Sequence, residues 1–504
     1  MSGLSTHLPI LPVLLPLVAG IVLLALRGAP LVLQRAASLV ATAALVPLAF
    51  ALLGTAGEGT QLVYKLGDWD APFGIVLVAD RLAAWMLMAT ALVALFALLQ
   101  ALAGTDVEGR HFHVLYQLQL FGLNGAFLTG DLFNLFVFFE ILLLASYGLL
   151  LHGGGRLRVK AGLHFVVINL VGSTLFLFAV GTLYGVAGTL NMADLAVKLA
   201  RTVPENLALV EAAGLMLFGV FALKAALLPL HLWLPAAYAH TSAPVAALFA
   251  IMTKVGAYSI LRVYSLMFGA EAGAVANLLA DWLMPLALAT LVAGTLGAVA
   301  STSLRQQIAY LVIASVGTLL AAFALDSAEG IAAGLYYLPH TTLGTAAFFL
   351  LAAPIAGARG TLGDRFDSGA AMPGARVLGG LFFVAAIALA GLPPLSGFLG
   401  KFMLLRAALG SPWLAWVWAI VLTTSLFAVI ALARSGSLLF YRTHSTPEVL
   451  SAPRPIEWLP AAGLLLLVLG MVIWAGTLAD YSAATAAQLL APQTYIDAVL
   501  GDRP

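Results

Sequence analysis

Long apolar runs recur along the whole chain, and they constrain its fold more than any other feature of the sequence. A segment needs roughly 20 mainly apolar residues to cross the hydrocarbon core of a bilayer. Fourteen such segments predict an all-α polytopic membrane protein of about 14 transmembrane helices. The predicted spans are residues 8–26, 31–53, 81–103, 112–130, 132–151, 161–187, 209–230, 243–266, 275–300, 305–325, 330–352, 377–407, 412–433 and 457–477.

The composition excludes several classes of function. Hydrophobic residues make up 62% of the chain and charged residues 9%, whereas ordinary soluble domains carry about 25% charged residues. Cysteine is absent, so disulfides, thiolate metal sites and iron–sulfur clusters are excluded. No metal-spaced histidine cluster or phosphate-binding loop is present, and we expect no cofactor, no metal and no nucleic-acid partner. The first apolar run has no Lys or Arg before it, which favours a retained first span over a cleaved signal peptide.

Three short matches at similar offsets indicate an internal repeat. The matched pairs are EILLLASYG at 140–148 with AYLVIASVG at 309–317, LVGSTLFLF at 170–178 with TLGTAAFFL at 342–350, and LLPLHLW at 227–233 with LPPLSGF at 392–398. They predict two five-helix repeats, spans 4–8 and spans 9–13. Because five is an odd number, the second copy is expected to be inverted, with a broken helix in each half at span 7 and span 12. Chance similarity between short apolar segments is the alternative.

This repeat divides the chain into four predicted parts. They are a three-helix segment at 1–111, the first repeat at 112–270, the inverted repeat at 271–440, and a C-terminal helix and tail at 441–504. We also expect an interfacial amphipathic helix at 189–206 and a short surface helix after Asp480.

The distribution of Lys and Arg predicts the orientation of the chain. Thirteen of the 23 basic residues follow odd-numbered spans, and seven, including Arg262, lie on the opposite side. Cytoplasmic loops carry the excess of basic residues, so both termini are expected outside, with Arg156, Arg158 and Lys160 in the cytoplasm.

Four charged residues lie deep inside predicted spans, where an unpaired charge costs several kcal/mol. Glu140 is nine residues into its span, or ~13 Å of helix, which places it near the middle of the bilayer. Lys224 and Lys254 occupy similar depths on either side of Pro229, and Lys401 follows Pro393 and Pro394.

We interpret these four residues as groups that exchange protons, with Glu140 as the counter-charge of Lys224. Burial disfavours the charged form of a lysine and a nearby carboxylate favours it, so a balance of the two permits gain and loss of a proton. The alternatives are a protonated Glu140, lysines that reach an interface, and purely structural hydrogen bonds.

His340 lies between the two groups of lysines in the sequence and is a candidate proton relay, since both of its ring nitrogens can exchange protons near neutral pH. A hydrogen-bonded core histidine is the alternative. For His231 and His240, a role at the mouth of the path and a plain loop position are equally open. The carboxylates near span ends are interpreted as ordinary solvated groups: Asp80, Asp131 and Asp281.

Several long motifs make the chain resemble a known family. These are FVFFEI around Glu140, FALKAALLPLHLWLP around Lys224, AHTSAPVAALFA at 239–250, IMTKVGAY around Lys254, and GLPPLSGFLGKF around Lys401. Spans 4–13 resemble the antiporter-like proton-translocating subunits shared by respiratory complex I, membrane-bound hydrogenases and Mrp-type Na+/H+ antiporters. The segments at 67–85 and 130–149 look most like the D-subunit branch of the Mrp type.

The resemblance implies a 14-helix fold, inverted repeats and a complex with other small and large membrane subunits in a bacterial inner membrane. It also implies that Glu140, Lys224, Lys254 and Lys401 match the family's buried proton path, although Ala309 stands where the second half would repeat the glutamate. The expected function is H+ exchange for Na+ or K+, driven by the proton motive force, in a transporter subunit that is not an enzyme.

Other functions stay open at this point. A subunit of a redox-driven proton pump would use the same lysines, a non-conducting scaffold would use none of them, and a permease for an organic solute lacks a polar cluster in the sequence. The cation itself passes either through this chain or through a partner. The small number of acids favours the partner, because a dehydrated Na+ needs several oxygen ligands.

Overall fold

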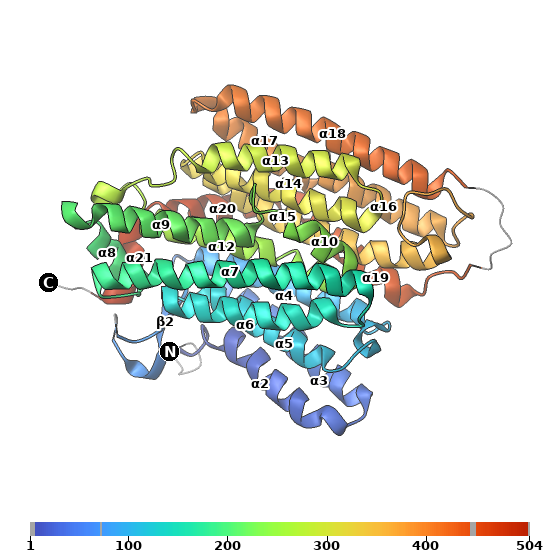
Figure 1. Cartoon of the computed structure of the whole chain (residues 1–504), viewed down its shortest axis with the longest axis horizontal. Coiled ribbons are helices and arrows are strands. Elements are labelled where there is room, and N and C mark those ends of the chain that lie inside the picture. Colours follow the sequence, from blue (N-terminus) through green and yellow to red (C-terminus); the bar gives the residue numbers. More distant parts are fainter. Residues whose placement is uncertain (1–5, 71–72, 444–449, 502–504) are drawn as a thin grey trace.

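Long helices lie side by side along the longest axis of the protein (Figure 1). The computed structural model describes residues 6–70, 73–443 and 450–501. Within these residues, twelve helical segments are long and apolar enough to cross a membrane, so the predicted polytopic helical membrane protein is confirmed. The segments are Leu11–Gly28 (α2, Leu11–Ala25, and a short turn), α3 Leu31–Gly57, α4 Arg81–Ala101, α6 Leu132–Leu151, α7 Arg156–Ala187, α9 Pro204–Ala225, Ala243–Leu266 (α11 and α12), α13 Leu283–Ala300, α14 Leu304–Phe323, α15 Ala328–Ala358, α18 Leu414–Phe440 and α19 Pro455–Ile473.

Two of the fourteen predicted spans fall short of this length. Helix α5, Phe112–Leu128, has 17 residues, and the predicted span at 377–407 is divided into α16, Ala375–Ala390, and α17, Ser396–Ala407. The count of fourteen therefore stays a prediction.

Helix breaks occur at both of the predicted proline positions. Helix α9 ends at Ala225 and α10, Trp233–His240, follows after a stretch that contains Pro229, while Pro393 and Pro394 separate α16 from α17. Proline has no N–H group to donate, so carbonyl groups at the end of the preceding helix are left without their helical partners. A third interruption, which the sequence did not predict, separates α11, Ala243–Phe249, from α12, Met252–Leu266.

Three helices form the buried centre of the bundle. Nearly every residue of α12, α14 and α15 is buried. Peripheral helices such as α2, α3 and α18 instead expose large apolar side chains, as expected for surfaces that face lipid or another subunit. The core helices therefore form the interior in which the buried polar side chains of the chain lie.

The expectation of an all-α fold needs one correction. Strand β1, Leu62–Lys65, pairs antiparallel with β2, Val76–Ala79, in a hairpin between α3 and α4. Each strand has only four residues, which is too short for the alternation of apolar and polar positions to be recognised in the sequence.

The helices near the C-terminus also differ from the prediction. A single surface helix was expected after Asp480, but α20 spans Ala475–Leu489 and α21 spans Pro492–Leu500. Tyr481 of α20 stacks on Trp85 of α4 with ring centroids 4.9 Å apart, so this helix packs against the bundle. Likewise, the helix predicted at 189–206 is only α8, Met192–Leu199, and most of its residues are buried.

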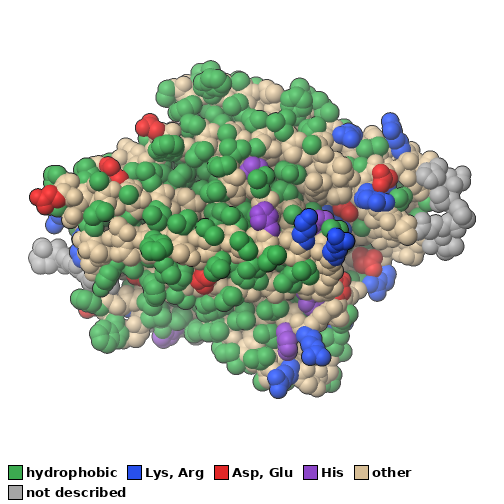
Figure 2. Space-filling model, viewed as in Figure 1, with side chains coloured by type: hydrophobic (Ala, Val, Ile, Leu, Met, Phe, Trp, Pro, Cys, Tyr) green, Lys and Arg blue, Asp and Glu red, His purple; other side chains and the backbone are tan. Residues whose placement is uncertain are grey.

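Basic side chains gather toward one end of the protein. In Figure 2 most visible Lys and Arg residues lie at the right, whereas α21, the last helix, lies at the left in Figure 1. The prediction counts Arg262 as a basic residue outside the membrane. This assignment is wrong, because Arg262 is only 4% exposed within α12.

Candidate functional site

Glu140 and Lys224 are linked through α7 rather than by a direct ion pair. The hydroxyl of Ser173 donates a hydrogen bond to Glu140, and the Lys224 ammonium donates to Asn169 Oδ1 at 3.0 Å. Asn169 and Ser173 are four residues apart and so share one face of α7. No direct ion pair joins Glu140 to Lys224 within the described part of the chain, and the role of Glu140 as the counter-charge of Lys224 stays a prediction.

Lys224 is held in the last turn of α9, just before the break at Pro229. The C-terminal end of a helix carries a partial negative charge, which favours an ammonium group there. Its side chain is buried, and it lines a cavity of about 20 Å³ together with Asn169, Trp233 and Val255. A cavity of this size has room for roughly one water molecule beside Lys224.

Lys254 lies in the first turn of α12, directly after the interruption that follows α11. It is completely buried, and its Nζ atom donates to Ser315 Oγ of α14 at 3.2 Å. The hydroxyl of Ser315 in turn donates to the Val312 carbonyl at 2.7 Å. The hydrogen-bond partner of Lys254 is therefore a neutral hydroxyl group, and no carboxylate of the described residues pairs with it.

Lys401 has a hydrogen-bond acceptor at the second helix break. Its Nζ atom donates to the carbonyl of Ala390, the last residue of α16, at 3.0 Å, and to Ser425 Oγ of α18 at 2.9 Å. Gly391 allows this approach, because a Cβ atom there would lie 3.0 Å from the Lys401 nitrogen. The break thus supplies the acceptor that stabilises the lysine.

His340 occupies the buried middle of α15. Its Nδ1 atom lies 2.8 Å from Ser396 Oγ at the start of α17, and the Ser396 hydroxyl donates to the Val468 carbonyl at 3.2 Å. Gly397 keeps room for the ring, because a Cβ atom there would come within 2.7 Å of His340 Nε2. His340 therefore joins α15 to the broken helix that carries Lys401.

The three lysines of the predicted path share one chemical feature. Lys224, Lys254 and Lys401 each have neutral hydrogen-bond partners, and the partners are hydroxyl, amide or carbonyl oxygens. Such partners accept a hydrogen bond from an ammonium without adding a fixed counter-charge beside it. Within the described residues no group of three or more His, Asp or Glu side chains is placed to hold a metal ion.

A buried ion pair that the sequence did not predict lies at the far end of α12. Arg262 meets Asp80 through two contacts of 2.6 and 2.7 Å, and both residues are almost fully buried. The Asp80 carboxylate also accepts from the Ala83 N–H, which caps α4. The expectation that Asp80 is an ordinary solvated carboxylate is therefore wrong.

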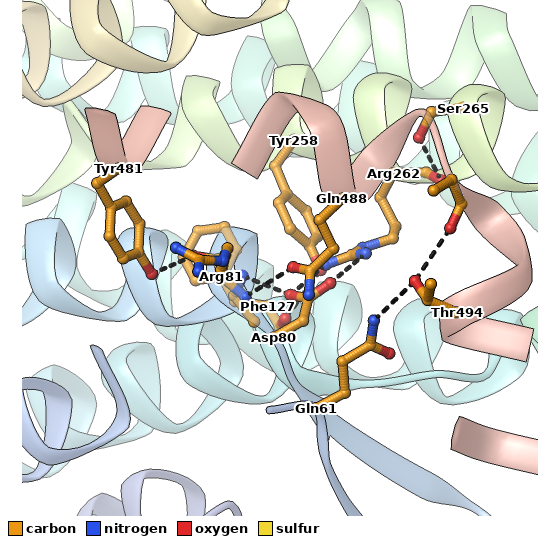
Figure 3. A network of polar contacts seen from close by, with 12 residues as sticks. Gln61, Asp80, Arg81, Phe127, Tyr258, Arg262, Ser265, Tyr481, Gln488 and Thr494 are labelled. Atoms are coloured by element: carbon orange, nitrogen blue, oxygen red, sulfur yellow. Dashed lines mark hydrogen bonds and ion pairs between the residues drawn. The ribbon is translucent and has the colours of Figure 1, made fainter. Parts of the chain in front are cut away.

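The ion pair belongs to a network of polar contacts between several helices (Figure 3). The hydroxyl of Tyr258 donates to the Phe127 carbonyl at 2.8 Å and accepts from Arg262 Nε at 3.4 Å. The ring of Tyr495, from α21, covers the Arg262 guanidinium at 5.3 Å. The position of Arg262, two turns beyond Lys254 on one helix, was the signal in the sequence that could have identified it as buried.

A polytopic bundle with broken helices and a lysine at each break has the architecture of a membrane transport protein. The family described as NADH:quinone oxidoreductase/Mrp antiporter, TM, matches residues 129–428. The chain belongs to this family.

Individual relatives cover almost the whole chain. The D subunit of a probable K+/H+ antiporter of Rhizobium meliloti is 44% identical over 99% of this chain and 98% of its own length. The D subunit of an Na+/H+ antiporter of Bacillus subtilis is 36% identical over 97% and 99% of the two chains. A chain in the structure of the Mrp complex from Dietzia sp. DQ12-45-1b has a TM-score of 0.88 and 29% identity, over 99% of this chain and 100% of that chain.

Proposed function

We propose that this chain is a proton-translocating subunit of a multisubunit antiporter, which exchanges H+ for a monovalent cation and is driven by the proton motive force. The observation that carries the proposal is the row of lysines with neutral partners inside the bundle, in a chain that is 44% identical to the D subunit of an antiporter. A transmembrane row of amines that can each release a proton suits proton transfer better than the binding of a fixed charge.

The proposed path begins at Glu140 and runs through Lys224 and Lys254 to His340 and Lys401. Glu140 and Lys401 are partly exposed on the surface of the chain, whereas the three residues between them are buried. Glu140 and Lys224 contact one face of α7 through Ser173 and Asn169, so the two groups are close enough for the charge of Glu140 to act electrostatically on Lys224.

The cation is Na+ or K+, and we propose that it crosses through a partner protein of the complex. Relatives of this chain are named for each ion. A dehydrated Na+ requires several oxygen ligands, and the lysines of the proposed path would repel a cation. Other membrane subunits of an Mrp-type complex are the proposed partners, as the name of the similar solved complex suggests.

The topology belongs to the proposal as well. Fourteen spans, with inverted repeats at 112–270 and 271–440 between the segments 1–111 and 441–504, would place both termini outside a bacterial inner membrane. The gathering of Lys and Arg at one end of the bundle supports this orientation. A reporter fused after Pro504 should therefore score as extracytoplasmic, and a cytoplasmic signal would contradict the orientation.

A redox-driven proton pump is the second candidate, because the family description includes NADH:quinone oxidoreductase. Everted vesicles that carry the assembled complex separate the two functions. Antiport predicts that Na+ or K+ collapses a preformed pH gradient without any electron donor, and that Lys224→Ala in equal amounts of complex abolishes this response. A cation response that is unchanged in Lys224→Ala would refute the proposed role of this chain.

A further inference from the structure

An apolar groove runs between α16 and α18 on the outside of the bundle. Its volume is about 760 Å³, whereas the cavity beside Lys224 has only about 20 Å³. Helix α18 lies along the outer edge of the bundle (Figure 1). The groove is lined by the buried ring of Phe382 and by the ring of Phe383, which is 65% exposed. It is therefore a surface feature that a molecule in the bilayer can enter.

Glycine residues on both helices make room for the groove. A Cβ atom at Gly380 of α16 would meet no heavy atom of another helix within 4 Å, so open space begins directly at the backbone. At Gly436 of α18, a Cβ atom would come within 2.9 Å of Phe382 Cε1, so the absence of a side chain lets the aromatic ring lie against α18. The two helices therefore pack together without filling the space on this side.

The length of the groove matches one leaflet of a bilayer. The two helices are antiparallel here, because Gly379 lies beside Phe440 and Gly436 lies beside Phe382. On α16 the lining extends from residue 376 to residue 390, which is ~21 Å of helix. The hydrocarbon core of a bilayer is about 30 Å thick, so one leaflet accounts for about 15 Å. The groove therefore suits an acyl chain of one leaflet better than a partner helix, which would cross both leaflets.

One end of the groove is cationic. Arg376, in the first turn of α16, lines this end and is exposed, and among the described residues it makes no ion pair. Tyr441, which follows α18 directly, lines the same end and is 83% exposed. No acidic side chain occurs among the described residues that line the groove. An apolar trough with an unpaired guanidinium at its end complements an anionic lipid.

We propose that this groove binds an anionic phospholipid of the cytoplasmic leaflet, with its phosphate at Arg376 and an acyl chain between α16 and α18. Anionic lipids give the cytoplasmic leaflet its negative surface potential, and basic pockets between transmembrane helices on that side bind such head groups. A guanidinium group also donates two parallel hydrogen bonds to a phosphate. The choice of leaflet rests on the proposed orientation, whereas lipid binding itself requires no proton transfer.

The inner end of the groove lies beside the helix break that holds Lys401. Ala390 lines the groove, and its carbonyl accepts the hydrogen bond from Lys401 Nζ at 3.0 Å. Leu392, within the break, lines the groove as well. The acyl chain of a bound lipid therefore packs against the segment that supplies the acceptor of Lys401.

Photoreactive lipids test this binding in the assembled complex. The complex is placed in bilayers with phosphatidylglycerol or phosphatidylcholine probes that carry the same diazirine-labelled acyl chain, and mass spectrometry locates the labelled peptides after illumination. The phosphatidylglycerol probe should label α16 and α18 about fivefold more than the phosphatidylcholine probe, which is roughly the preference that one basic residue provides. Arg376→Gln should remove this preference. Gly380→Leu should lower the labelling by both probes, because the leucine side chain occupies the groove.

Two matched variants serve as controls. Arg156→Gln removes an exposed basic residue at the start of α7, outside the groove. Gly181→Leu replaces an exposed glycine of α7 whose Cβ atom would also meet open space. Both variants should keep the labelling and the lipid preference of the wild type. A loss of the preference in Arg156→Gln equal to that in Arg376→Gln would overturn the proposed site.

The remaining outcomes also decide the question. Equal labelling by the two probes in the wild type would show ordinary contact with bulk lipid and overturn the inference. Absence of label from α16 and α18 would overturn it as well, because a partner protein would then cover the groove. Labelling is measured without any ion gradient. A failed labelling test therefore leaves the proposed antiport standing, and a failed antiport test leaves the lipid site standing.

Discussion

Helix α12 carries two buried cations whose surroundings differ completely. Lys254 donates to the neutral hydroxyl of Ser315 at 3.2 Å, whereas Arg262 is locked to the Asp80 carboxylate at 2.6 Å and is covered by Tyr495. The two residues are eight positions apart, or about 12 Å along the helix. One end of the same helix therefore holds a lysine with a neutral partner, and the other end holds an arginine paired with a carboxylate.

This difference separates the groups that we propose to transfer protons from the groups that join helices to one another. An arginine does not lose its proton in a protein, and a carboxylate beside it fixes the charge of both partners. A lysine with neutral partners has no such constraint, which is why the proposed path runs through the lysines. The ion pair also joins α4 and α12, and the Tyr495 ring of α21 lies over the Arg262 guanidinium.

The largest effect is expected from breaking the ion pair. Arg262→Ala would leave the buried Asp80 carboxylate without a partner, which costs about 3–5 kcal/mol of stability. The measurement is the thermal stability and the amount of the assembled complex in membranes. The double variant Asp80→Asn with Arg262→Gln removes both charges and should recover part of the loss. A single variant as stable as the wild type would show that the pair does not hold the fold.

The next largest effect is expected from Lys224→Arg, which keeps the charge of the side chain but prevents the release of its proton. Lys224→Arg keeps a cation beside Asn169, so the complex should assemble, but its guanidinium releases no proton at any useful pH. Antiport should fall about 100-fold, within the range that acid–base groups contribute. Vesicles with equal amounts of complex provide the measurement. Wild-type antiport in this variant would make Lys224 a fixed counter-charge and end the relay mechanism.

A smaller loss is expected at Lys401. It is the sole lysine of residues 271–440, so no neighbouring ammonium can replace it. Lys401→Ala should reduce antiport about tenfold or more because an acid–base group is lost, while the complex still assembles because no carboxylate is left unpaired. The comparison with Arg262→Ala is direct, because one variant should lose activity and the other stability. Near-normal antiport in Lys401→Ala would remove this residue from the path.

The smallest effect is expected from a conservative change at the start of the path. Glu140→Asp keeps the carboxylate but withdraws it by one methylene from Ser173, so antiport should fall only about two- to fivefold. Glu140→Ala, as the severe control, should abolish antiport. Initial rates of pH-gradient collapse distinguish the two variants, and equal rates in both would exclude a charge requirement at this position.

Some properties of this protein follow from the sequence alone. Apolar runs of membrane-spanning length predict the helical bundle, and twelve of them are present as helices of sufficient length. The buried charges were recognisable because hydrocarbon strongly disfavours them, so Glu140, Lys224, Lys254 and Lys401 stand out from their surroundings. The prolines at 229 and 393–394 predicted the two helix breaks because proline removes a backbone donor wherever it occurs.

Only the tertiary structure decided which group each charge meets. Asp80 and Arg262 are 182 positions apart, and no local pattern relates them. Asn169, Ser173 and Ser315 are ordinary residues in the sequence, and they become partners of the path because packing turns their faces toward it. Local periodicity indicates which residues are buried. The identity of a buried neighbour depends instead on how distant helices pack. That neighbour decides whether a buried charge is paired with an opposite charge or has only neutral partners.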